Sequence, residues 1–177
     1  MQNIKMIIGL GNPVLKYNKT RHNTGVWYLE MLSKLYNKKF IKIKKFNGYE
    51  SNIIYSKKKI ILFIPDIFMN LNFLPILKIS SFYNIKLSEM LIIHDELDLE
   101  PGEVKLKNGF GSNGHKGLKG IIQAFKKKTF YQRLSIGIGR PQKNYVTSDY
   151  VLSPPDLCEK KKIFKAIRKS ILSIFSI

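Results

Sequence analysis

Short apolar runs alternate along the chain with polar loops and with segments of helical periodicity. Ile4 and residues 6–8 predict a strand buried on both faces, because such strands carry nearly continuous apolar side chains. The run ends at residues 9–13, whose glycines and proline force a turn. Apolar residues then recur at helical spacing, at Val26, Leu29, Leu32 and Tyr36. The amino-terminal part therefore predicts a strand, a polar loop and a helix.

The same alternation predicts further elements of both kinds. We expect strands at 49–55 and 60–64 with a turn at 56–59 between them, and further strands at 90–93, 104–107 and 134–138. We expect helices from Pro75 to about Tyr83, over 118–125 with basic residues 126–128 at its end, and over 160–177. The basic stretch 38–45 predicts an exposed edge or loop. A chain of 177 residues with this alternation is typical of one α/β domain with a sizeable core.

Charge and cysteine content narrow the function classes. The chain has 31 Lys and Arg against 12 Asp and Glu, a net charge of +19 that favours a polyanionic partner such as RNA. The whole sequence is also rich in Lys, Ile and Asn, so many lysines can serve solubility alone. The single cysteine, Cys158, excludes an intramolecular disulfide and a cysteine metal cluster, and favours the reducing cytoplasm. No apolar stretch approaches the roughly 18 residues of a membrane span, and we expect no targeting segment.

The loop after the first strand gathers the first candidate functional residues. It carries Asn12, Tyr17, His22 and Asn23 at the carboxyl end of a strand, where open α/β sheets bind ligands. Asn12 can instead be a turn former, Asn23 a helix N-cap, and His22 a histidine without chemistry. A dinucleotide-binding loop is disfavoured, because its third glycine would fall at Val14.

Two later strands end in polar loops at the same predicted edge. Phe68, Met69 and Asn70 follow the strand at 60–64, with core packing as the alternative for the first two. Residues 94–98 follow the strand at 90–93 and carry three carboxylates, which cannot all be buried. One carboxylate beside a histidine would fix its tautomer and stabilise its protonated form. Magnesium binding is the rival use of such an acidic cluster.

A glycine-rich loop and a basic helix complete the candidates. Residues 109–117 form a glycine-rich loop before a helix, where backbone N–H groups can approach a phosphate or a substrate closely. The glycine spacing is not that of a Walker loop. The helix at 160–177 has an apolar stripe and a basic face, which suits either solvent or an RNA backbone.

Six segments together resemble the motifs of bacterial peptidyl-tRNA hydrolases. They are residues 8–13 with Tyr17 and 20–23, residues 68–71, 94–99 with 101–102, 114–115 with 117–119, 136–141, and 150–152. They follow in order and with family-like spacing over about residues 4–175, which makes the resemblance far more specific than any single motif.

The resemblance implies a fold, a reaction and catalytic residues. It implies a monomeric hydrolase whose single domain, residues 1–177, has a twisted mixed β-sheet flanked by α-helices. Such an enzyme cleaves the ester between a peptide and the terminal ribose of tRNA, with no metal or cofactor and no protein or membrane partner. By position, His22 matches the general base and Asp95 the carboxylate that supports its basic form. Asn12 matches a residue that holds the peptidyl part and helps to reject unblocked aminoacyl-tRNA.

The resemblance also implies a set of substrate contacts. Tyr17, Phe68 and Met69 match residues that line the groove for the end of the substrate. Asn70 matches a residue that holds the peptidyl part, and Lys105 a basic residue near the tRNA backbone. The substrate-binding residues expected on this basis are Tyr17, Phe68, Met69, Asn70, His115, Lys116 and Lys105.

Three positions depart from the family pattern. Lys116 stands where asparagine is usual, and it donates hydrogen bonds but accepts none. Phe73 replaces a small residue, and Ser135 replaces an arginine thought to help hold tRNA, with Arg133 or residues 126–128 as substitutes. Lys116 is the best reason for an alternative, a catalytically inactive RNA-binding protein on the same scaffold. A metal-dependent nuclease using Asp95, Glu96 and Asp98 is the other alternative.

Overall fold

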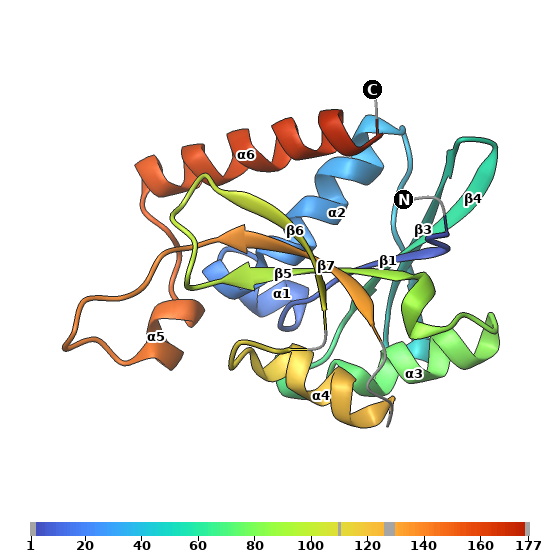
Figure 1. Ribbon diagram of the computed structural model, residues 1–177, viewed down its shortest axis with the longest axis horizontal. Helices are drawn as coiled ribbons and strands as arrows, with labels where there is room; N and C mark the ends of the chain where they lie inside the picture. The colour runs from blue at the N-terminus through green and yellow to red at the C-terminus, as the bar shows by residue number, and fades with distance from the viewer. Residues whose placement is uncertain (1–2, 110, 126–129, 176–177) are drawn as a thin grey trace.

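The computed structural model describes residues 3–109, 111–125 and 130–175, and these form a sheet with helices on both faces (Figure 1). Its strands are β1 (Met6–Gly9), β2 (Ile41–Ile43), β3 (Gly48–Tyr55), β4 (Lys58–Pro65), β5 (Met90–Glu96), β6 (Val104–Gly109) and β7 (Tyr131–Gly137). Their order in the sheet is β2-β3-β4-β1-β5-β7-β6. The central pairs are parallel and the outer ones antiparallel. The predicted α/β fold with a mixed sheet is confirmed.

The helices form two layers around the sheet. They are α1 (Val14–Tyr17), α2 (Thr24–Leu35), α3 (Phe73–Phe82), α4 (Lys116–Ala124), α5 (Thr147–Leu152) and α6 (Leu157–Phe175). In Figure 1, α2 and α6 cover one face of the sheet and α3 and α4 the other. Successive side chains of β1 serve these two layers in turn, since Ile7 belongs to one core cluster and Met6 and Ile8 to the other. This explains why the strand is apolar throughout.

Several predicted boundaries shift for identifiable reasons. β5 continues to Glu96, because residues 94–96 pair with residues 135–137 of β7, so most of the expected acidic loop is strand. The hairpin turn contains only Ser56 and Lys57, both in the left-handed region with φ of 48° and 62°. Helix α5 was not expected. The predicted basic end of the fourth helix, residues 126–128, lies outside the described residues.

Two glycines bring helix α2 onto the sheet. A Cβ on Gly25 would lie 2.7 Å from the carbonyl oxygen of Leu10, and it would also clash with the carbonyl oxygen of Ile93. A Cβ on Gly9 would meet the backbone of Gly25. Helix α2 therefore rests directly on the backbone of the strands. This contact sets the short 3-10 turn η1 (Arg21–Asn23), which precedes α2, above the carboxyl ends of β1 and β5.

Candidate active site

A cavity of about 690 Å³ opens at the carboxyl ends of the central strands. The sequence-predicted residues that line it are Asn12, Tyr17, His22, Phe68, Met69, Asn70, Asp95, His115 and Lys116. They come from the loops after β1 and β4, from the end of β5 and from the start of α4. The fold thus gathers nearly the whole predicted set in one place.

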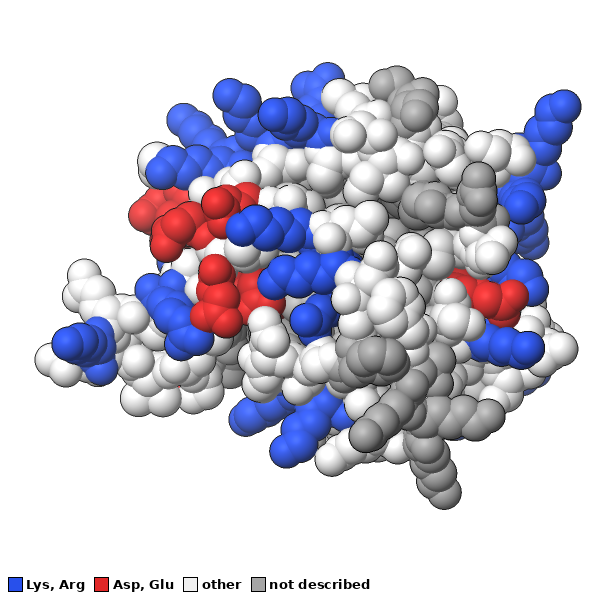
Figure 2. All heavy atoms as spheres, viewed as in Figure 1, with Lys and Arg blue, Asp and Glu red and all other residues white. Residues whose placement is uncertain are grey.

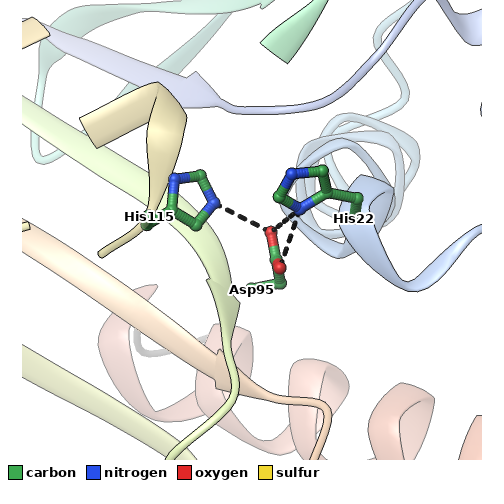
Figure 3. Close-up of side chains that lie close together, drawn as sticks. All are labelled: His22, Asp95 and His115. Atoms are coloured by element: carbon green, nitrogen blue, oxygen red, sulfur yellow. Dashed lines mark hydrogen bonds and ion pairs between the residues drawn. The ribbon is translucent and has the colours of Figure 1, made fainter. Parts of the chain in front are cut away.

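His22 and Asp95 both line this cavity, and their side chains point toward each other (Figure 3). Nδ1 of His22 lies 2.8 Å from Oδ1 and 2.8 Å from Oδ2 of Asp95. Burial alone would raise the pKa of Asp95, but His22 and then His115 hold the pKa of this carboxyl well below its ordinary value. The ionised carboxylate keeps the ring proton of His22 on Nδ1, which leaves a lone pair on Nε2.

His115 is a second donor to the same carboxylate. Its Nε2 lies 3.0 Å from Oδ1 of Asp95, and its Nδ1 accepts the backbone N–H of Leu118 at 3.2 Å. Because Nδ1 accepts a hydrogen bond, the ring proton sits on Nε2 and points at Asp95. The sequence predicted that His115 contacts substrate, whereas the structure engages both ring nitrogens within the protein.

The side chain of Asn12 is oriented by its neighbours. Its Oδ1 accepts the backbone N–H of Met69 at 2.8 Å, so its Nδ2 can only be a donor. Nδ2 makes no hydrogen bond within the described part of the chain, and Asn12 lines the cavity. The backbone of Asn12 is held by the side chain of Asn23, which does not cap helix α2. Asn23 therefore occupies the N-cap position of α2, as the alternative interpretation expected, but its side chain makes no capping hydrogen bond there.

Asn72 joins the two loops that carry Asn12 and Asn70, and sequence reasoning missed it. This fully buried side chain accepts from the N–H of Gly11 at 3.3 Å and donates to the carbonyl of Gly11 at 3.1 Å. It also donates to the carbonyls of Ile67 and Phe68. The signal available in the sequence was a second amide, two residues after Asn70, among apolar residues at a helix start.

The residues after β4 form one wall of the cavity. Phe68 is 52% exposed and its ring lies 6.2 Å from that of Tyr17, edge to face. Met69 is buried in the core cluster beneath, where a Cβ on Gly117 would come within 2.6 Å of its sulfur. Asn70 is exposed at the mouth. The alternative interpretation, core packing, thus holds for Met69, which also lines the cavity, but not for the exposed Phe68.

The two predicted lysines differ in position. Lys116 is exposed at the first position of α4 and lines the cavity. Lys105 lies on the edge strand β6, outside the cavity lining, with Glu103 at 3.8 Å. A contact of Lys105 with a long substrate is possible only beyond the cavity itself.

The segment after β7 supplies a wall that the sequence did not predict. Its cavity-lining residues are Arg140, Thr147, Ser148, Val151 and Leu152. The guanidinium of Arg140 contacts Oδ1 of Asp98 through two nitrogens, at 2.8 and 2.5 Å. Arg140, Val151 and Leu152 fall in two of the family-like segments but were given no site role, and Thr147 and Ser148 fall in none of them, so the structure alone places these five residues in the cavity wall.

The other two departures from the family pattern have local explanations. Phe73 packs against α4 where Gly120 leaves room, since a Cβ there would lie 3.0 Å from the ring. Ser135 is fully buried, and its Oγ lies 3.0 Å from Nε2 of His94. Arg133 is buried and donates to the carbonyl of Gly111, so its guanidinium is engaged inside the protein. Burial, and secondarily the neighbouring His115, lowers the pKa of His94 to about 3.

One group in the described ranges has the composition of a metal site, and it is His22, Asp95 and His115. One ligand atom from each lies within 4.8 Å of the others. An ion there would have to displace both ring protons that point at Asp95, and the displaced proton of His115 would then face the N–H of Leu118. The donor set therefore fits hydrogen bonding better than metal binding. The three carboxylates of the nuclease alternative, Asp95, Glu96 and Asp98, have separate partners. Glu96 lies near Asn113 and Lys107, and Asp98 is bound to Arg140.

Basic side chains gather along α6, at the top of the view in Figure 2. The exposed ones on this helix are Lys160, Lys161, Lys162, Lys165, Arg168 and Lys169. Among the described residues, no helix combines the length and the apolar character needed to cross a membrane.

The fold and the cavity define a class, an α/β protein whose site is a histidine held by a buried carboxylate at the sheet's carboxyl edge. Comparison with known proteins gives the family. The family model described as peptidyl-tRNA hydrolase matches residues 6–176, and the chain belongs to this family.

Relatives agree over most of the chain. A peptidyl-tRNA hydrolase of Buchnera aphidicola subsp. Cinara cedri is 52% identical over 171 residues, covering 97% of this chain and 89% of the relative. That of Haemophilus influenzae is 41% identical, covering 94% and 86%. The crystal structure of peptidyl-tRNA hydrolase from Acinetobacter baumannii has a TM-score of 0.91 at 35% identity, covering 98% and 88%.

Proposed function

We propose that this protein hydrolyses the ester between a peptide and the terminal ribose of tRNA, with His22 as the general base. The observation that carries this proposal is Nε2 of His22 in the cavity, which has no hydrogen-bond partner among the described residues and lies opposite the Nδ1–H that Asp95 holds. A hydrolase of an ester needs one well-placed base, because an alkoxide leaves far more easily than the nitrogen anion that an amide would release without protonation.

The chemistry follows from these two groups. Nε2 of His22 removes a proton from a water molecule as its oxygen attacks the ester carbonyl carbon, and Asp95 stabilises the imidazolium that forms. The tetrahedral oxyanion then collapses, the bond to the ribose oxygen breaks, and Nε2–H returns its proton to that oxygen. General-base catalysis of this kind contributes about 10²–10⁴-fold. The products are the free peptide acid and a tRNA with its terminal hydroxyl.

Asn12 supplies a donor for this reaction. Because its Oδ1 is occupied by the N–H of Met69, the amide presents Nδ2–H to the cavity. This orientation suits the carbonyl oxygen of the ester, whose negative charge grows in the transition state. The amide needs no reorganisation to serve in this way.

The rest of the cavity suits a peptide attached to RNA. Asn70 can bind the peptide backbone, and Tyr17 and Phe68 offer an apolar wall that accepts many side chains. Lys116, Lys105 and the basic face of α6 suit phosphates, which would make binding depend little on tRNA sequence. We further propose that the protein acts as a monomer in the cytoplasm, since one chain supplies every residue of the proposed site.

The test is release of N-acetylated amino acid from N-acetyl-aminoacyl-tRNA in the presence of EDTA. We expect turnover by the wild type, loss of at least about 10²-fold in His22→Ala, and no change in Lys78→Ala, an exposed control on α3. Tight tRNA binding without turnover would favour the inactive RNA-binding protein. Activity that EDTA abolishes would favour the metal-dependent alternative.

A further inference from the structure

The carboxylate that orients His22 is shared with a second imidazole. Oδ1 of Asp95 lies 2.8 Å from Nδ1 of His22 and 3.0 Å from Nε2 of His115. Figure 3 shows the two rings on opposite sides of the carboxylate, one from η1 and the other from the start of α4. The ring centroids are 5.1 Å apart.

The start of α4 fixes the role of His115. Its ring is the N-cap of this helix, with Nδ1 accepting the N–H of Leu118. A proton on Nδ1 would face that N–H and break the cap, at the helix end where positive charge is least favourable. His115 is therefore held with Nδ1 as an acceptor from Leu118 and with its Nε2–H pointing at Asp95.

A carboxylate that accepts a second N–H is held more firmly in one orientation. It is also a weaker hydrogen-bond acceptor for its first donor, which here is Nδ1–H of His22. We propose that His115 is a positioning residue that acts through Asp95, setting the orientation and the basicity of His22 without contacting substrate. This inference rests on the proposed function. It assigns to the residue before Lys116 a role different from the substrate contact expected from the sequence.

The proposal predicts the direction of a pH effect. The positive end of the His115 N–H dipole faces Asp95 and lies near His22, so its removal favours protonation of His22. The charged groups around His22 are few: Asp95 and Glu96 on β5 and Lys116 on α4 line the cavity with it, and Arg140 does so from the segment after β7. Arg21, its chain neighbour, pairs instead with Glu159. Removal of the N–H of His115 leaves all of these charged side chains in the protein, so the predicted shift is assigned to the lost N–H.

Two substitutions separate the cap from the donor. In His115→Asn, the shorter amide can still cap α4 but ends short of Asp95. In His115→Gln, the longer amide can accept from Leu118 or donate to Asp95. We expect His115→Asn to fold, to lose about tenfold or more in kcat with KM changed less than about twofold, and to move the acid limb of kcat/KM up by at least about 0.5 pH units. His115→Gln should recover part of this shift.

A titration of the resting protein keeps this test separate from the activity itself. The ring C–H resonance of His22, followed by NMR against pH, should move up in pH by a similar amount in His115→Asn. If the wild type does not hydrolyse its substrate, the proposed function fails while the NMR shift still tests the inference. An unchanged His22 titration in folded His115→Asn overturns the inference, and so does a rise in KM with an unmoved acid limb, which would make His115 a substrate contact.

Discussion

Asn12 and Asn23 hold each other across the turn that follows β1. The backbone N–H of Asn12 donates to Oδ1 of Asn23 at 2.9 Å, and Nδ2 of Asn23 donates to the carbonyl of Asn12 at 3.0 Å. Asn23 is fully buried. The pair sets the backbone from which the Asn12 side chain reaches the cavity, and it ties this backbone to the turn that carries His22.

The first prediction concerns the stability of this pair. Asn23→Ala leaves a buried N–H and a buried carbonyl of Asn12 without partners, each at a cost of about 1–3 kcal/mol. We expect the free energy of unfolding, measured by urea denaturation, to fall by about 2–4 kcal/mol. Asn144→Ala, at an exposed position, is the control and should change it by less than about 0.5 kcal/mol. An equal free energy of unfolding in Asn23→Ala and the wild type would show that water replaces both hydrogen bonds to the backbone of Asn12.

Asn12→Asp isolates the proposed donor. The carboxylate still accepts the N–H of Met69 but offers an oxygen in place of Nδ2–H, and it adds negative charge near the oxyanion. We expect kcat to fall by about 10²–10³-fold, measured on N-acetyl-aminoacyl-tRNA, while urea denaturation stays close to wild type. Wild-type kcat in this variant would exclude Asn12 as an oxyanion donor.

His94 gives the protein a pH-dependent stability. Its pKa is lowered to about 3 in the folded chain, so its contribution is complete above the ordinary histidine pKa and is lost as pH falls from there toward about 3. Asp95, whose pKa is also lowered, loses its contribution only below the ordinary carboxyl pKa. As the pH falls from about 6.5 to 4.5, protonation of His94 in the unfolded chain should therefore lower the free energy of unfolding by about 2 kcal/mol.

The measurement is urea denaturation at both pH values in wild type and His94→Gln. The variant will be less stable at neutral pH, because the bond from Nδ1 to the carbonyl of Asp95 and the Ser135 contact are altered. The informative quantity is the difference between the two pH values, which should shrink by about 2 kcal/mol. An identical difference in both proteins would assign the acid sensitivity to other groups.

Arg21 anchors the turn that carries His22 to the carboxyl-terminal part of the chain. Its guanidinium lies 2.6 Å from Glu159 and 4.2 Å from the centre of the Tyr150 ring, and it also donates to Ser153 and Pro154. A lysine ammonium cannot reproduce the several directed hydrogen bonds of the planar guanidinium or its stacking on the Tyr150 ring. Arg21→Lys should lower the unfolding free energy by about 2 kcal/mol. Arg140→Lys, in an exposed ion pair, is the control, with an expected change below about 0.5 kcal/mol.

Lys116→Asn restores the residue usual in the family at the rim of the cavity. Lys116 is exposed and makes no ion pair within the described ranges, so its replacement should leave folding intact. We expect kcat/KM on N-acetyl-aminoacyl-tRNA to stay within a few-fold of wild type or to rise, because the amide both donates and accepts. A loss beyond about tenfold would show that this chain depends on the ammonium group.

The central strands and the first turn were predictable because their causes are local. β1 and residues 60–65 of β4 are apolar on both faces, and the glycines and proline of residues 9–13 admit only a turn. The ordered set of short motifs likewise placed His22, Asp95 and Asn12 at one sheet edge. Helix α5 was not predicted, because that segment is polar and its helix is short, although residues 150–152 at its end belong to a family-like segment.

What the sequence determined by itself was the alternation of strands and helices, the family and the loops on which the candidate residues lie. The tertiary structure alone decided that β5 runs on through Asp95, because β7 offers it partners there. It also decided which nitrogen of His115 is protonated and which way the amide of Asn12 points, since the N–H groups that settle both belong to Leu118 and Met69. Hydrogen-bond direction depends on which atoms meet in space, and no pattern along the chain encodes that.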